Sequence, residues 1–93
     1  MDEKAFYEWL INNKGYIKRS SRDVISRLKR ARNYVQFDAG SNIDEVLRDL
    51  NKNAEFLQLS MYVKPQIRTA LRYYFDFQRE QKGRVLRFEQ AFV

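Results

Sequence analysis

The sequence has 93 residues, of which 44% are hydrophobic and 15% aromatic, and its net charge is +6. This length allows one domain with a modest core, and the three glycines and single proline argue against a turn-rich sheet protein and against disorder. The lack of cysteine and histidine excludes a disulfide framework, a thiolate nucleophile and histidine-based catalysis or metal binding. We therefore expect a compact all-α protein that is not an enzyme and needs no cofactor or metal ion.

The N-terminal residues, Met-Asp-Glu-Lys, do not form a basic region followed by an apolar run, so they do not resemble a signal peptide. No apolar run in the sequence is long enough to span a bilayer. These features predict a cytoplasmic protein that does not contact membranes.

The charge of the chain alternates between segments. The net charge is −2 for residues 1–13, +7 for 14–36, −3 for 37–59 and +4 for 60–93. A surface that only needed solubility would mix both signs, so the two basic segments indicate a polyanionic partner.

Residues 3–13 have the spacing of a short amphipathic helix. Phe6, Trp9 and Leu10 share one side, acidic residues lie in the first turn, and Gly15 follows where a left-handed cap is expected. The periodicity predicts that Phe6 and Trp9 lie in the core, with stacking on nucleic-acid bases as the alternative.

A second, strongly basic helix is predicted over residues 20–36. Ser20 or Ser21 is expected to cap it, and Asp23 would complete a capping box with Ser20. The free amides at the start of a helix attract anions, so the basic start of this helix predicts a phosphate clamp. The alternative is an ordinary capped helix with solvated arginines. The predicted core face consists of Val24, Ile25, Leu28, Ala31 and Val35. The predicted clamp consists of Lys18, Arg19, Ser20, Ser21 and Arg22.

A break at residues 37–41 separates this helix from a third one, which is expected to begin near Ile43. Asn-Lys-Asn at 51–53 is a possible end of that helix, which would leave 54–59 as a separate turn. Its acidic outer residues, Asp44, Glu45 and Asp49, favour a packing role away from phosphates. The predicted core face consists of Ile43, Val46, Leu47, Leu50, Ala54 and Leu57.

The fourth predicted helix runs from Pro65, a residue suited to the first helical turn, to about Gln81. Arg68, Arg72 and Arg79 form a second basic edge, and the alternative is that Arg72 and Arg79 pair with Asp76 or Glu80 along the helix. Gly83 is predicted to end this helix, which divides the chain into a helical domain, 1–83, and a hydrophobic tail or linker, 84–93. The predicted inward residues are Ile67, Ala70, Leu71, Tyr74, Phe75 and Phe77.

One degenerate packing pattern covers roughly residues 4–82. It consists of Phe6, Trp9, Leu10, Gly15, Lys18, Arg19, Ser20, Arg27, Leu28, Tyr34, Lys64, Leu71, Arg72, Tyr73, Tyr74, Phe75 and Phe77. This pattern resembles the N-terminal core-binding (SAM-like) domain of the tyrosine recombinase, or phage integrase, family. The resemblance implies a four- to five-helix orthogonal bundle that holds duplex DNA against its second and fourth helices. The implied contacts are Lys18, Arg19, Ser21, Arg22, Ser26, Lys29, Arg30, Lys64, Arg68, Thr69 and Arg72, with Tyr73 as a further candidate.

The sequence departs from that family because it contains neither the C-terminal catalytic domain nor any histidine for its Arg/His/Arg cluster. We therefore expect either the DNA-clamp domain of a longer integrase or a separate small protein with the same fold. The leading hypothesis is a non-catalytic domain that binds double-stranded DNA in integration or recombination. The alternative is a protein-interaction module that docks on a partner, or on itself, through residues 84–93 and the acidic third helix. Neither hypothesis includes a small-molecule substrate.

Overall fold

Five α-helices make up the fold of the residues that the structure describes. The computed structural model describes residues 3–38 and 40–91, with side chains described for 3–38 and 40–81. Within these ranges there is no strand, which confirms the all-α prediction. In chain order the helices are α1 (Glu3–Lys14), α2 (Lys18–Ala31), α3 (Ile43–Lys52), α4 (Ala54–Leu57) and α5 (Val63–Ala91).

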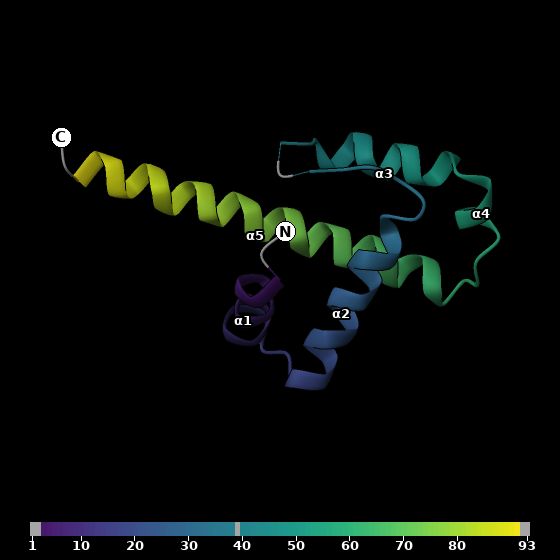
Figure 1. Cartoon of the computed structure of the whole chain (residues 1–93), viewed down its shortest axis with the longest axis horizontal. Coiled ribbons are helices and arrows are strands. Elements are labelled where there is room, and N and C mark those ends of the chain that lie inside the picture. The colour runs from purple at the N-terminus through teal and green to yellow at the C-terminus, as the bar shows by residue number, and fades with distance from the viewer. Residues whose placement is uncertain (1–2, 39, 92–93) are drawn as a thin grey trace.

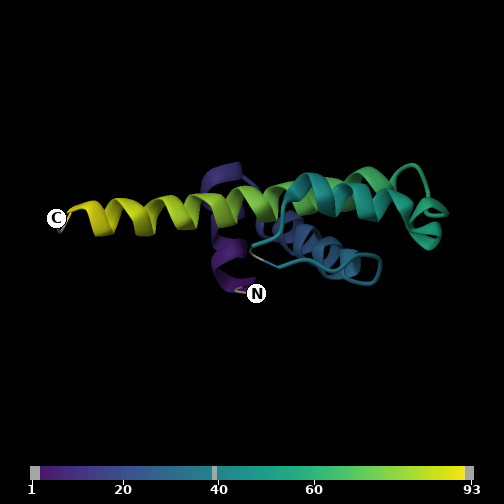
Figure 2. The ribbon, with the colours of Figure 1, turned by 90° about the horizontal axis from the view of Figure 1, so that it is seen from above.

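The longest helix, α5, is the centre of the arrangement. It packs against α1 and α2 on one side and against α3 on the other (Figure 1). Its 29 residues extend over about 44 Å at 1.5 Å per residue, and the whole molecule measures 51 × 29 × 16 Å. The C-terminal part of α5 therefore runs beyond the other four helices, as both views show (Figures 1 and 2).

The core is built around the ring of Phe6. This side chain is fully buried, and its ring centroid lies 6.0 Å from Trp9, 5.8 Å from Tyr74 and 5.4 Å from Phe77. The structure thus confirms the core positions predicted for Phe6 and Trp9. It also confirms the buried positions of Leu10, Val24, Ile25, Leu28, Ala31, Val35, Val46, Leu50, Ile67, Ala70, Leu71, Tyr74 and Phe77.

The joint between α1 and α2 contains Gly15, whose φ of 70° confirms the predicted left-handed conformation. The chain turns there, and the Tyr16 amide donates to the carbonyl of Leu10 at 3.3 Å. α2 then begins at Lys18, with Ile17 as an N-cap that makes no side-chain hydrogen bond. The prediction of a cap at Ser20 or Ser21 is wrong. Ser21 instead lies three and four residues before the first apolar residues of α2 and shares their buried face.

α2 ends at Ala31, five residues before the predicted end. Val35 is still buried, but from the segment that follows the turn at residues 32–34. Leaving the helix here allows Phe37 to reach Tyr74, with 5.8 Å between ring centroids, while the Arg32 guanidinium lies 4.7 Å from the Phe37 ring. The helical pattern therefore continues in the sequence after the helix itself has ended.

The break between α3 and α4 lies where the sequence predicted it. Asn42 caps α3 by accepting from the Asp44 amide at 2.8 Å, and Asn53 caps α4 by accepting from the Phe56 amide at 2.9 Å. The Asn53 amide group also donates to the Tyr34 carbonyl at 3.1 Å, which ties this corner to the turn after α2. Because the break resets the helical phase, Phe56 is buried, and the predicted core positions of Ala54 and Leu57 are wrong.

α5 begins and ends outside its predicted bounds. It starts at Val63, where the Ser60 hydroxyl accepts from the Val63 amide at 3.1 Å, and Pro65 fits in the first turn because its missing amide needs no helical partner there. The predicted end at Gly83 is wrong, since the helix continues to Ala91. A glycine inside a helix costs only about 1 kcal/mol relative to alanine, which longer helical runs tolerate. The predicted apolar tail, Val85, Leu86, Phe88, Phe92 and Val93, lies outside the described side chains.

Gly15, which follows the end of α1, and Gly83, which lies within α5, should respond in opposite ways to substitution by alanine. Gly15→Ala should lower the free energy of unfolding by about 1 kcal/mol, because alanine is strained at positive φ. No atom lies within 4 Å of the added Cβ, so the effect is conformational rather than steric. Gly83→Ala should instead increase the helical circular dichroism signal at 222 nm. A loss of that signal would contradict a continuous α5.

Candidate nucleic-acid interface

The outer face of α2 carries most of the charge of this helix. α2 contains six basic residues and one acidic residue. Its exposed basic side chains are Lys18, Arg19, Arg22, Lys29 and Arg30. Of these five, only Lys29 forms an ion pair within the described part of the chain, so four cations face solvent without a carboxylate partner. This separation of charge from core in α2 is the observation from which the sequence-based DNA hypothesis starts.

Two serines of α2 that were predicted to contact DNA have opposite environments. Ser26 is exposed. Ser21 is 0% exposed, and its hydroxyl has no hydrogen-bond partner among the described residues. Because its side chain is buried, Ser21 cannot contact an external partner. We therefore assign Ser21 to the packing of α2 and not to the predicted DNA contacts. The predicted clamp at the start of α2 is reduced to its exposed cations, Lys18, Arg19 and Arg22.

A groove of about 340 Å³ lies between α2 and the first turns of α5. Arg27 and Asp23 line it from α2, and Gln66 and Thr69 line it from α5. The predicted contact Thr69 therefore faces α2 across a shared groove. α2 and α5 are therefore neighbours, but Thr69 and the clamp residue Ser20 are the only predicted contacts that line the groove between them.

A second groove, of about 640 Å³, lies on the other side of α2, against α1. Three predicted contacts, Arg22, Ser26 and Lys29, line it. The Lys29 ammonium lies 2.9 Å from Glu3 Oε1 at the rim. α2 is thus a ridge with one groove on each side. Arg22, Ser26 and Lys29 line the groove against α1, Thr69 lines the groove against α5, and the other predicted DNA contacts line neither.

The basic edge predicted along α5 is not continuous. The Lys64 ammonium donates to the Leu57 carbonyl at 3.2 Å, and the Arg68 guanidinium donates to Asn51 Oδ1 at 2.9 and 3.2 Å. Arg68 also lies over the ring of Phe56, 5.3 Å from its centroid. Both cations therefore face α3 and α4. Arg72 is exposed and forms no ion pair with any described residue.

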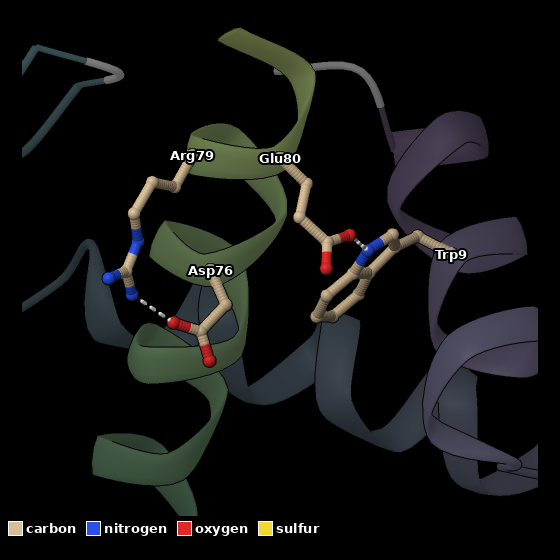
Figure 3. A network of polar contacts seen from close by, with 4 residues as sticks. All are labelled: Trp9, Asp76, Arg79 and Glu80. Atoms are coloured by element: carbon tan, nitrogen blue, oxygen red, sulfur yellow. Dashed lines mark hydrogen bonds and ion pairs between the residues drawn. The ribbon is translucent and has the colours of Figure 1, made fainter. Parts of the chain in front are cut away.

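The carboxylates near the middle of α5 have separate partners (Figure 3). Asp76 pairs with Arg79 one turn along the helix, which confirms one of the two pairings weighed for Arg79. Glu80 points to the other side of the helix and accepts from the indole nitrogen of Trp9. Arg79 is therefore paired within α5, whereas Arg72 has no carboxylate partner among the described residues.

An aromatic and cationic cluster holds the α1–α2 joint against α5. The Tyr16 hydroxyl donates to the Tyr73 hydroxyl at 3.0 Å, and the Lys14 ammonium lies 5.3 Å from the Trp9 ring and 5.4 Å from the Tyr73 ring. The hydrogen bond to Tyr73, together with partial burial, raises the pKa of Tyr16 above its usual value of 10.0, while nearby Arg27 acts in the opposite direction. Tyr73, a further predicted DNA contact, is half-buried in this cluster.

Sequence reasoning did not select several residues that line the two grooves. Lys4 and Tyr7 lie one turn apart on α1 and face α2, and Arg27 reaches the α2–α5 groove. The i, i+3 spacing of Lys4 and Tyr7 places them on one side of α1, but the pattern alone does not tell which helix that side meets. Only the packing of α1 on α2 makes them part of a groove.

No protein-family model, curated protein or solved structure matches this chain. Within the part of the chain that the structure describes, no helix combines the length and apolar character needed to cross a bilayer. Those same residues contain no group of three or more side chains suited to holding a metal ion.

The Tyr16–Tyr73 pair should make stability depend on pH in the alkaline range. Because folding raises the pKa of Tyr16, its stabilising contribution is present below pH 10.0 and is lost as the pH rises through the folded-state value. Urea unfolding between pH 8 and 11 should therefore show a smaller loss of stability for Tyr16→Phe than for the wild type. Equal losses in the two proteins would show that the pair does not contribute.

Proposed function

We propose that the chain is a non-catalytic helical domain that binds duplex DNA through α2 and the adjoining part of α5. Such a role corresponds to the clamp domain of a tyrosine recombinase or integrase, which the sequence pattern resembles. The observation that carries the proposal is the outer face of α2. There Lys18, Arg19, Arg22 and Arg30 are exposed and form no ion pair with any described residue. Open cations on one helix face are the electrostatic footprint of a phosphate-binding surface.

The dimensions of α2 suit a duplex. Its 14 residues extend over about 21 Å, and the major groove of B-DNA, roughly 12 Å wide, admits one α-helix. The grooves on both sides of α2 leave space beside the helix for the sugar–phosphate backbones that border a major groove. Arg19 and Arg30 are exposed and line neither groove, so they are the side chains of α2 best placed for base edges.

Fewer residues of α5 are available for direct contact with DNA than the sequence predicted. Thr69 lines the groove shared with α2, and Arg72 is exposed, so these two are direct candidates. Lys64 and Arg68 have hydrogen-bond partners on the α3–α4 side, at exposed sites where a phosphate oxygen can replace the acceptor. In this proposal α2 therefore makes most of the phosphate contacts, and α5 helps to orient the duplex on α2.

Binding of a random-sequence duplex should weaken steeply as salt rises, because each phosphate contact contributes about 0.9 to the slope of log K against log salt. The double variant Arg19→Gln/Arg30→Gln should bind about tenfold more weakly at 50 mM salt and should lower the slope by about 2. Filter binding of a labelled duplex over a salt series measures both quantities.

Arg48→Gln/Lys52→Gln is the matched control, since it removes the same charge from exposed positions of α3. It should change affinity far less than the α2 variant. Absence of binding at low salt, or binding that does not respond to salt, would contradict the proposal.

The alternative, a protein-interaction module, is favoured by the length of α5. The helix continues through residues 84–91 and extends beyond the other helices (Figure 1). Acidic residues Asp44, Glu45 and Asp49 are exposed on α3, which gives this part of the surface the charge opposite to that of α2. Docking through the end of α5 and through α3 is compatible with DNA binding on α2, because different residues would serve each partner.

Deletion of residues 84–93 distinguishes the two roles. If the end of α5 mediates self-association, the full chain should sediment as a dimer or larger assembly and the truncated chain as a monomer. The deletion removes a net charge of only +1, so affinity for duplex DNA should stay within about twofold of the full chain. If the full chain sediments as a monomer, docking of the chain on a second copy of itself is contradicted.

A further inference from the structure

We infer that the α1–α2 groove is a binding subsite for a phosphate of the DNA backbone, and that Glu3 at its rim competes with this phosphate for Lys29. The inference rests on the proposed function, because the phosphate belongs to the same duplex that α2 binds. It adds Lys4 and Tyr7 of α1, which the sequence analysis did not select, to the DNA-contacting surface.

The lining of the groove has the chemistry of an anion site. Lys4 from α1 and Arg22 and Lys29 from α2 supply three cations from two helices. Tyr7 and Ser26 supply hydroxyl groups that donate hydrogen bonds. A phosphodiester exposes two acceptor oxygens, so donors that converge from both walls can bind it together.

The volume and exposure of the groove make this site accessible. The space is about 640 Å³, the larger of the two grooves that border α2, and it opens to solvent beside the ridge. The side chain of Ile25 lies at its apolar floor, where it is nearly buried. A phosphate that enters from the ridge side meets the cationic walls before it reaches this floor.

Glu3 is the single acidic residue in the lining, and it already occupies one of the three cations. Its carboxylate lies 2.9 Å from the Lys29 ammonium, and both side chains are about half exposed, at 47% and 56%. Ion pairs with this exposure contribute little stability, so a phosphate can displace the carboxylate. The pair nevertheless holds the Lys29 ammonium on the α1 side of α2, where the phosphate would need it. Glu3 therefore positions Lys29 in the free protein and weakens binding of the anion.

Two substitutions on α1 test this subsite. Lys4→Gln should weaken binding of a random-sequence duplex about threefold at 50 mM salt and lower the salt slope by about 1. Glu3→Gln should strengthen binding about threefold at the same salt, because it frees Lys29 and removes a carboxylate that repels the phosphate. Both effects should shrink at 0.5 M salt, where charges are screened.

Glu8→Gln is the matched control for Glu3→Gln, since Glu8 is exposed on the same helix but does not line the groove. It makes the same charge change and should alter affinity clearly less than Glu3→Gln. Circular dichroism melting of each variant confirms that the helices remain folded. The control thus separates a local effect in the groove from a general effect of net charge.

The subsite is disproved if Lys4→Gln binds with the wild-type affinity and salt slope while Arg19→Gln/Arg30→Gln still weakens binding. It is also disproved if Glu3→Gln binds no more tightly than Glu8→Gln. If the wild-type chain fails to bind the duplex at low salt, the proposed function fails and the subsite fails with it. The wild-type titration therefore distinguishes failure of the DNA-binding proposal from failure of the groove alone.

Discussion

The packing of α5 against three other helices is the constraint on which the rest of the molecule depends. Phe6 from α1 contacts Tyr74 and Phe77 of α5, and the buried face of α2 lies beside them. Burial of this apolar and aromatic surface is the main favourable term in folding such a small domain. Once α5 has these neighbours, the orientation of α1, α2 and α3 about their own axes is fixed.

The orientation of α2 shows what this constraint does to charge. Val24 and Leu28 must face the core, so the basic residues on the opposite side cannot turn inward. The same packing produces a groove on each side of α2, one against α1 and one against α5. The cationic ridge and the two grooves are thus consequences of how the core is filled.

Local patterns predicted much of the fold. Apolar periodicity predicted α1, α3 and the inward residues of α5, and Asn-Lys-Asn at 51–53 located the break between α3 and α4. At Ser21 the packing of the helix overrides the local preference. Ser21 has the chemistry of a cap but the spacing of a core residue, and its spacing decided its place. Gly83 is a common helix terminator, yet it lies within α5. Charge and periodicity predicted the basic faces, and the family resemblance implied the individual contacts. The two grooves beside α2 depend on helix packing that no local pattern contains.

Trp9 gives this domain a built-in optical reporter. It is the only tryptophan in the sequence, and its indole nitrogen donates to Glu80 while the Lys14 ammonium lies over its ring. Indole emission responds to nearby charge and to water, so separation of α1 from α5 should change both the wavelength and the intensity of emitted light. Because Trp9 is buried away from the ridge of α2, its emission can follow the docking of these two helices without a chemical label and without perturbing the basic surface.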